Sequence, residues 1–308
     1  MTMLPEGHIV RATGKRRIPL PEREKVNPGE IDAARPVELA VLAVRGSTAR
    51  CLLSGTQKEI TLRSGGLWNV CPGDVVKVHA RKVWICSRHP YISGQVEGSQ
   101  PDLESFGLTP LRLEDLGRWE PKDHYWGEKG EPLEPWAEPI YKRGPRPEFE
   151  MEQVIPGEDP EDPDSDPITE AVDLYHGGAF REAWELLMDL VQADLRCLDA
   201  HAHLGNFSFD HRVKAALRHY EVGVKIGDFS LGLAFGGLLP WAAVDNRPFL
   251  RCLHGYGLCL WRLGLRDQAA AVFERMLWLN PTDNQGARFL LSDIQAGRDW
   301  KPEEKGPF

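Results

Sequence analysis

The chain has 308 residues, a formal net charge of −9 and a hydrophobic content of 42%. This length accommodates two domains, and the apolar content excludes an intrinsically disordered chain. The sequence shows no signal peptide and no apolar segment of the roughly 20 residues that a membrane helix needs, so it predicts a soluble, cytoplasmic protein with no membrane partner.

Charge is distributed unevenly along the chain. Residues 1–100 carry 15 Lys and Arg against 9 Asp and Glu, residues 101–170 carry 7 against 20, and residues 171–308 carry 15 against 17. A basic head, an acidic middle and a nearly neutral tail predict different partners for different parts of the chain. The six cysteines are scattered and form no CxxC motif, which indicates reduced thiols rather than a disulfide framework.

The first 98 residues divide into an arm and a small β domain. Residues 1–35 contain several prolines and a GKRR cluster at 14–17 and lack apolar periodicity, so they are predicted to be a basic arm that stays flexible until a partner binds it. Residues 36–98 consist of short runs rich in β-branched residues, separated by Gly, Pro and Asp. Five such strands in about 60 residues predict a small β-barrel.

The run from residue 49 to residue 96 resembles the OB domains of the smallest bacterial initiation factor and of ribosomal RNA-binding barrels. The resemblance rests on the PGD turn at 72–74, which opens a strand, and on a closing strand with Gly94 and Val96. It implies an RNA-binding barrel, in which aromatic side chains stack on bases and cations lie along the phosphates. The candidate nucleic-acid-binding residues are Arg45, Arg50, Lys58, Arg63, Trp68, Lys77, Arg81, Lys82, Trp84, Arg88, His89 and Tyr91. The competing interpretation is that the tryptophans belong to the core and that the charges only solvate the surface.

Residues 99–166 are rich in Pro, Trp and acidic side chains, with Trp119, Trp126 and Trp136 spaced between prolines. They are predicted to form an extended segment whose aromatic side chains lie against a neighbouring surface and which ends in an exposed acidic linker. An alternative is that this segment folds back over the basic barrel as an autoinhibitory strand.

Residues 167–296 show apolar residues at spacings of three and four, in segments separated by short turns, which predicts antiparallel helix pairs. Asp166 and Pro167 provide an N-cap carboxylate and a first-turn proline at the start of this domain. The clearest unit, 249–281, resembles a 34-residue tetratricopeptide repeat. The resemblance rests on Gly257, Gly264, Ala269, Phe273 and Pro281, which stand at the matching offsets.

Two weaker copies of the repeat span residues 171–191 and 201–224. After the clearest unit, Thr282 and Gln285 are predicted to form a capping box that opens a last helix through Ile294. Residues 297–308 are assigned to a tail.

The tetratricopeptide resemblance implies a concave surface that binds a protein partner, with no reaction attached to it. The stretch 238–251 interrupts the repeat pattern, and its candidate partner-binding residues in a polar pocket are Asp245, Asn246, Arg247 and Arg251. The simpler interpretation is that Asn246 caps a helix and that the arginines pair with nearby acids. The uncharged stretch 229–244 is expected to be a buried helix and turn.

The sequence contains no phosphate-binding loop, nucleophile elbow or HExxH motif. Cys71, His79, Cys86 and His89 are of the types that bind zinc, but their spacing matches no standard zinc site, and Cys86 is expected in the core. No cofactor and no metal are therefore predicted.

The predicted fold class combines an N-terminal OB-like β-barrel, an extended Pro/Trp/acid-rich middle and a C-terminal α-solenoid of TPR-like helix pairs. The predicted function is a non-catalytic adaptor that binds RNA, for example on a ribosome, through the barrel and a protein partner through the array. One alternative is a purely protein-binding scaffold or chaperone, and a second is an enzyme with a pocket near residues 245–251. The sequence makes no prediction of the oligomeric state.

Overall fold

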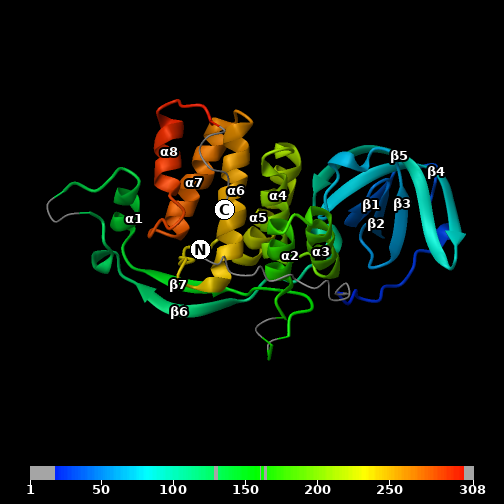
Figure 1. The fold of residues 1–308 in the computed structure, drawn as a ribbon, viewed down its shortest axis with the longest axis horizontal. Helices are drawn as coiled ribbons and strands as arrows, with labels where there is room; N and C mark the ends of the chain where they lie inside the picture. The colour runs from blue at the N-terminus through cyan, green and yellow to red at the C-terminus, as the bar shows by residue number, and fades with distance from the viewer. Residues whose placement is uncertain (1–17, 128–130, 160, 163–164, 302–308) are drawn as a thin grey trace, which may run out of the picture.

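The N-terminal domain of the computed structural model is a closed five-stranded barrel, which confirms the predicted barrel (Figure 1). The structure describes residues 18–127, 131–159, 161–162 and 165–301. Strand β3 pairs in parallel with β5, and the other neighbouring strands pair antiparallel. The strands are β1 (Val37–Arg45), β2 (Thr48–Leu53), β3 (Glu59–Arg63), β4 (Asp74–Cys86) and β5 (His89–Pro101). Alternate side chains point inward, and the barrel core contains Leu39, Val41, Cys51, Ile60, Leu62, Val76, Val78 and Ile92.

Residues 18–35, part of the predicted flexible arm, are attached to the molecule through two buried side chains, while most of the segment is exposed. Val26 is buried in the barrel core, and its backbone N–H donates to the carbonyl of Glu59 over 3.0 Å. Ile18 is buried against the first helices of the array. Burying these two apolar side chains is favourable, so the segment connects the barrel to the first helices of the array. The GKRR cluster at 14–17 lies outside the described residues.

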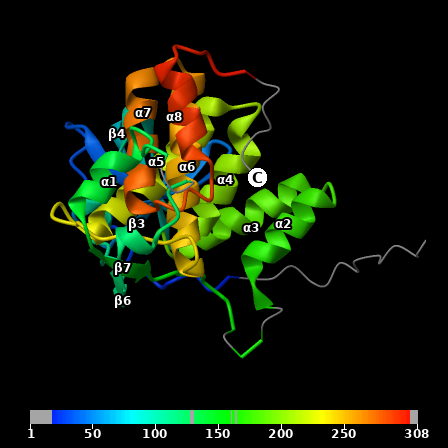
Figure 2. The ribbon, with the colours of Figure 1, turned by 90° about the vertical axis from the view of Figure 1, so that its left-hand side faces the viewer.

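The C-terminal half is an array of helices that run side by side (Figure 2). Its helices are α2 (Pro167–His176), α3 (Phe180–Ala193), α4 (Leu198–Phe209), α5 (Val213–Leu231), α6 (Arg247–Arg262), α7 (Arg266–Leu279) and α8 (Ala287–Gln295). The predicted start is confirmed, because the Asp166 carboxylate accepts from the backbone N–H groups of Ile168 and Thr169. The predicted helical solenoid is likewise present.

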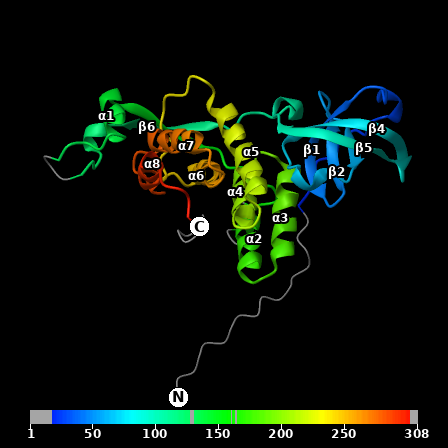
Figure 3. The same ribbon diagram turned by 90° about the horizontal axis from the view of Figure 1, so that it is seen from above.

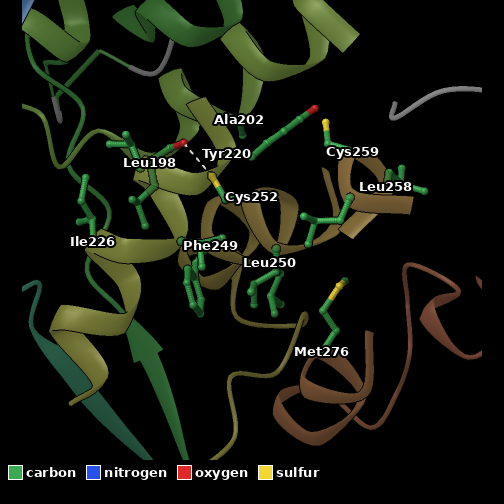
Figure 4. Close-up of a cluster of buried hydrophobic side chains, with 14 of the residues drawn as sticks. Leu198, Ala202, Tyr220, Ile226, Phe249, Leu250, Cys252, Leu258, Cys259 and Met276 are labelled. Atoms are coloured by element: carbon green, nitrogen blue, oxygen red, sulfur yellow. Dashed lines mark hydrogen bonds between the residues drawn. The ribbon is translucent and has the colours of Figure 1, made fainter. Parts of the chain in front are cut away.

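Small residues set the spacing of the helices in this array. A Cβ on Gly205 would meet the Tyr220 ring at 2.5 Å, and one on Gly257 would meet the Phe273 ring at 2.8 Å. The glycines therefore allow α4 to approach α5, and α6 to approach α7, with an aromatic ring filling the space beside each contact. Figure 4 shows the core between these helices, with Tyr220, Cys252 and Phe249 among its labelled members.

The capping box predicted at the last helix is wrong. Gly286 precedes α8 with a φ of 70°, and the Asp283 carboxylate accepts from the backbone N–H groups of Ala287 (2.6 Å) and Arg288 (3.3 Å). Thr282 instead donates its hydroxyl to neighbouring asparagine side chains. A glycine in the left-handed conformation shifts the helix start beyond the predicted cap.

The middle of the chain contains a two-stranded ribbon, where the sequence predicted extended chain. Strand β6 (Leu113–Trp119) pairs antiparallel with β7 (Arg146–Met151), and helix α1 (Ala137–Arg143) lies between them in sequence. The side chains of Trp119, Trp126 and Trp136 pack against the core that includes α6, α7 and α8. Figure 3 shows α1 and the barrel at opposite ends of the molecule, whereas the start of the middle contacts the barrel, with Gln57 donating to the carbonyl of Phe106 over 3.1 Å.

One buried arginine attaches the ribbon to the array. Arg146 is 1% exposed, and its guanidinium donates to the carbonyls of Gly236 (2.9 Å), Gly237 (2.6 Å) and Trp278 (2.7 Å). The same group lies 4.2 Å from the centre of the Trp278 ring. Burial lowers the pKa of Arg146 to about 10. Three charge-assisted hydrogen bonds and a cation–π contact offset the cost of burying this charge.

The uncharged stretch 229–244 does not form the buried helix and turn that its composition suggests. Helix α5 ends at Leu231, and within it the side chain of Phe229 is exposed. Leu233 in the following loop is also fully exposed, whereas Leu238 and Leu239 are buried. Within the described ranges, no helix combines the length and the apolar composition that crossing a bilayer requires.

The PGD turn joins the barrel to the array. A Cβ on Gly73 would meet the Val222 side chain of α5 at 2.7 Å, and Asp74 is fully buried, accepting from Arg218 (2.5 Å) and from the backbone N–H of Cys71 (3.0 Å). Ala40, Leu42 and Val75 of the barrel belong to the same hydrophobic core as α4 and α5. The barrel and the array therefore share a continuous interior.

A buried histidine is expected to make the array less stable in acid. Burial lowers the pKa of His201 to about 4, while an unfolded histidine titrates near 6.5. The unfolded chain therefore binds more protons between these values, so stability is present near neutral pH and is lost as the pH falls from about 6.5 toward 4. His201 is expected to contribute about 3 kcal/mol to this loss.

Urea unfolding of the wild type and of His201→Leu at pH 7 and pH 4 measures this contribution. The wild type should lose more free energy of unfolding than the variant between the two pH values. Equal losses in both proteins would contradict the assignment to His201.

Candidate functional site

A pocket of about 250 Å³ opens between helices α4 and α6. We call it the α4–α6 groove; it is lined by His203, Asn206, Trp241, Arg251, His254, Asn284 and Gln285. His203 and Asn206 stand three residues apart on α4, as Arg251 and His254 do on α6. This spacing places each pair on one face of its helix, so the two helices present four polar side chains to the same space.

The groove lining carries donors and no carboxylate. Arg251 supplies the permanent charge, and its guanidinium donates to Asp199 over 3.0 Å beside the groove. Burial lowers the pKa of His254 to about 4 and also lowers the pKa of His203. Both imidazoles are therefore neutral near pH 7, and the groove favours groups that accept hydrogen bonds or carry negative charge.

A second pocket of about 480 Å³ lies beside the groove. We call it the tryptophan cleft; its lining includes Arg118, Trp119, Glu120, Asp123, His124, Glu148, Trp241 and Asn284. Trp241 and Asn284 line both pockets. The Trp241 position is held because Arg247 donates to its carbonyl over 3.1 Å and lies 5.3 Å from its ring centre.

The four predicted partner-binding residues are separated by the structure. Arg251 lies in the groove and pairs with an acid, as the simpler interpretation expected, whereas Arg247 supports Trp241. Asp245 lines a different, acidic pocket with Glu150. Burial, followed by the nearby carboxylate of Glu150, raises the pKa of Asp245.

Asn246 is fully buried, which corrects both predictions made for it. Its side chain makes no helix-capping bond. Its amide group accepts from the backbone N–H of Met151 (2.8 Å) and donates to the carbonyls of Phe149 (2.9 Å) and Pro240 (3.0 Å). Asn246 therefore binds the ribbon to the array and is not available to a partner.

On the barrel, the structure brings five of the predicted nucleic-acid residues together. The Trp84 and Tyr91 rings stack at 5.4 Å with an interplanar angle of 14°, Arg63 lies 4.9 Å from the Tyr91 ring centre, and Lys82 lies 5.7 Å from that of Trp84. His89 packs edge-on against Tyr91 and shares a 2.7 Å hydrogen bond with Thr61. We call Arg63, Lys82, Trp84, His89 and Tyr91 the barrel aromatic face.

Strand register explains why these residues meet. Trp84 is paired with Tyr91 across β4 and β5, and Tyr91 with Thr61 across β5 and β3. Their neighbours Ile92 and Leu62 are buried in the barrel. Because side chains alternate along a strand, the paired aromatic residues point outward.

The other predicted nucleic-acid residues serve different roles or lie apart. Four of these cations are paired with acids, in the pairs Arg45–Asp189, Arg50–Glu59, Lys58–Glu30 and Lys77–Glu38. Trp68 is 72% exposed and lies near Arg212 of the array. Arg81 and Arg88 are exposed on the β4–β5 hairpin, where Arg88 adopts a φ of 64° in the tight turn.

The potential zinc ligands are not brought together. Cys86 is exposed near the hairpin turn, which corrects its expected place in the core, and Cys71 is buried with its Sγ 3.2 Å from His219 Nδ1. Over the part of the chain that the structure describes, no group of three or more His, Cys, Asp and Glu side chains is placed to hold a metal.

Sequence reasoning missed most of the groove. The patterns around Asn206 and His254 predict only helix packing, and Trp241 lies in the stretch 238–251 that interrupts the repeat. That break is the one available signal, because a polar-lined pocket forms where the chain departs from the repeat.

No protein-family model and no curated protein matches the chain. Among solved structures, it is similar to the first TPR of Spaghetti (RPAP3) bound to the HSP90 peptide SRMEEVD, with 17% sequence identity and a TM-score of 0.33. The similarity covers 42% of this chain and 89% of that chain.

Proposed function

We propose that the chain is a non-catalytic adaptor whose helical array binds an extended segment of a protein partner in the α4–α6 groove. The observation that carries this proposal is a carboxylate-free pocket lined by four helical polar side chains and by Trp241. Backbone carbonyls and acidic side chains of a peptide accept hydrogen bonds from such donors, and a tryptophan wall provides apolar contact. The volume of about 250 Å³ fits a short stretch of peptide better than a folded surface.

Site-specific photo-crosslinking in cells tests the proposal. A photoreactive phenylalanine analogue replacing Gln285 in the groove is expected to form an adduct with one discrete protein, since the groove brings the partner within bond-forming distance. The same analogue replacing Phe180, which is 59% exposed on α3 and lines neither the groove nor the tryptophan cleft, is the control. Adducts of equal yield at Phe180 and Gln285, or none at Gln285, would count against a partner in the groove.

A second function is favoured by the barrel aromatic face: binding of single-stranded RNA by an OB-like barrel. The strand order, with β3 parallel to β5 and β4 closing on β1, supports the OB-like assignment. The stacked Trp84 and Tyr91 rings give bases a platform, and Arg63 and Lys82 supply cations at its edge. Base–aromatic stacking tolerates any sequence, whereas the cations make binding depend on salt.

Trp84→Ala is expected to weaken RNA binding by about 5- to 150-fold, because each base–aromatic stack contributes roughly 1–3 kcal/mol. Fluorescence anisotropy with a labelled short oligouridylate at low salt measures the affinity of the full chain, since the isolated barrel would expose the core it shares with the array. Trp68→Ala, which removes an exposed tryptophan outside the barrel aromatic face, is the matched control. Equal affinity in all three proteins, or none in the wild type, would remove the RNA function.

A further inference from the structure

We propose that the partner segment carries opposite charges on the two sides of Trp241, with a carboxylate in the α4–α6 groove and a Lys or Arg side chain in the tryptophan cleft. This inference rests on the proposed peptide-binding function and specifies the chemistry of the peptide.

Trp241 and Asn284 form the boundary between the two sites, since both residues line both pockets. A segment that passes over Trp241 therefore places different side chains in environments of different charge. Arg247 holds the Trp241 backbone and ring, and the amide oxygen of Asn280 accepts from the Trp241 backbone N–H over 3.2 Å. The boundary is thus fixed at both its backbone and its ring before a partner arrives.

The groove side selects a negative charge. Its lining contains Arg251 and the side-chain amide of Gln285, with no carboxylate among its seven residues. The Asp199 carboxylate beside it is largely buried and lies 3.0 Å from Arg251 Nη1 and 3.7 Å from His203 Nε2. The guanidinium of Arg251 is half-exposed and donates to Asp199 through Nη1, so further N–H groups of the same fork can reach a ligand.

The cleft side selects a positive charge. Glu120, Asp123 and Glu148 line it against one arginine, Arg118, which is already paired with Glu120 at 3.3 Å. Glu148 is half-buried, and among the described residues no basic nitrogen lies within ion-pair distance of its carboxylate.

The tryptophan walls strengthen this selection. Trp119 and Trp241 line the same cleft as Glu148. A Lys or Arg side chain entering it would meet a half-buried carboxylate and aromatic rings that attract cations. The cleft therefore offers a cation both an ion pair and a cation–π contact.

Selection of short random peptides from a displayed library on the full chain tests this inference. The wild type should enrich peptides that combine an acidic and a basic side chain. Glu148→Gln should reduce the enrichment of Lys and Arg by roughly tenfold while leaving the acidic preference in place. Asn206→Asp keeps an acceptor for the Tyr220 hydroxyl. It should reduce the enrichment of acidic residues while leaving the preference for Lys and Arg in place, because it puts a negative charge in the groove.

Glu114→Gln, on the same ribbon but outside the tryptophan cleft, is the matched control and should select like the wild type. Thermal melting of each variant checks that the fold is retained. Peptides selected by the wild type without any preference for Lys or Arg would overturn the charge assignment and leave the peptide-binding function standing. A wild type that selects no peptide would overturn both.

Discussion

Arg146→Ala is expected to lower the free energy of unfolding by about 3–5 kcal/mol, because it leaves buried groups without partners. Three carbonyls lose their donor: those of Gly236 and Gly237 in the loop after α5, and that of Trp278 near the end of α7. The Trp278 ring also loses its cation–π contact. Urea unfolding followed by circular dichroism measures the loss.

Arg146→Lys should recover only part of this stability, because one ammonium group cannot reproduce the planar fork that reaches three carbonyls. Arg118→Ala, which removes an exposed arginine with one ion pair from the same ribbon, should cost no more than about 1 kcal/mol. A stability of Arg146→Ala equal to that of the wild type would show that the ribbon is not held by this side chain.

Arg218→Ala is expected to cost about 3–5 kcal/mol at neutral pH, because it strands the fully buried Asp74 carboxylate at the barrel–array boundary. Burial raises the pKa of Asp74, and Arg218 opposes that rise. The folded variant therefore takes up a proton at a higher pH than the unfolded chain does, so its stability falls as the pH rises through that window. The penalty should shrink as the pH is lowered, which denaturant unfolding at neutral and acidic pH would reveal.

The double variant Asp74→Asn with Arg218→Met separates the ion pair from the packing around it. It removes both charges, and it should be more stable at neutral pH than Arg218→Ala alone. A double variant as unstable as the single one would show that packing, rather than the stranded carboxylate, causes the loss.

The parts of the fold that follow local patterns were predictable from the sequence. Asp166 caps its helix as predicted, and Gly257 packs under Phe273 at the predicted offset. Strand-length runs of β-branched residues likewise formed the barrel. These features depend on residues that are near in sequence, where periodicity and capping preferences act directly.

The parts that depend on long-range polar contacts were not predictable. The acidic, proline-rich segment around Arg146 predicts an exposed arginine. Arg146 is buried instead, because its guanidinium donates to carbonyls about 90 and 130 residues away. Asn246 resembles a helix cap in its local sequence, yet its side chain is buried because it bonds to the distant backbone of Phe149 and Met151. On the barrel, Arg45 and Lys77 are as basic as Arg63 and Lys82, and only the tertiary fold decides which of them meets an acid.

The shared interior of barrel and array also fixes the distance between the two proposed binding sites. Because Gly73 packs on Val222 and the two domains have a common core, the barrel aromatic face and the α4–α6 groove are held at one separation. If both proposed sites are occupied, a target that presents RNA and peptide at that separation gains avidity, since binding at one site raises the effective concentration at the other. A target with a different spacing gains no avidity, so the fixed separation would select targets by the distance between their RNA and peptide segments.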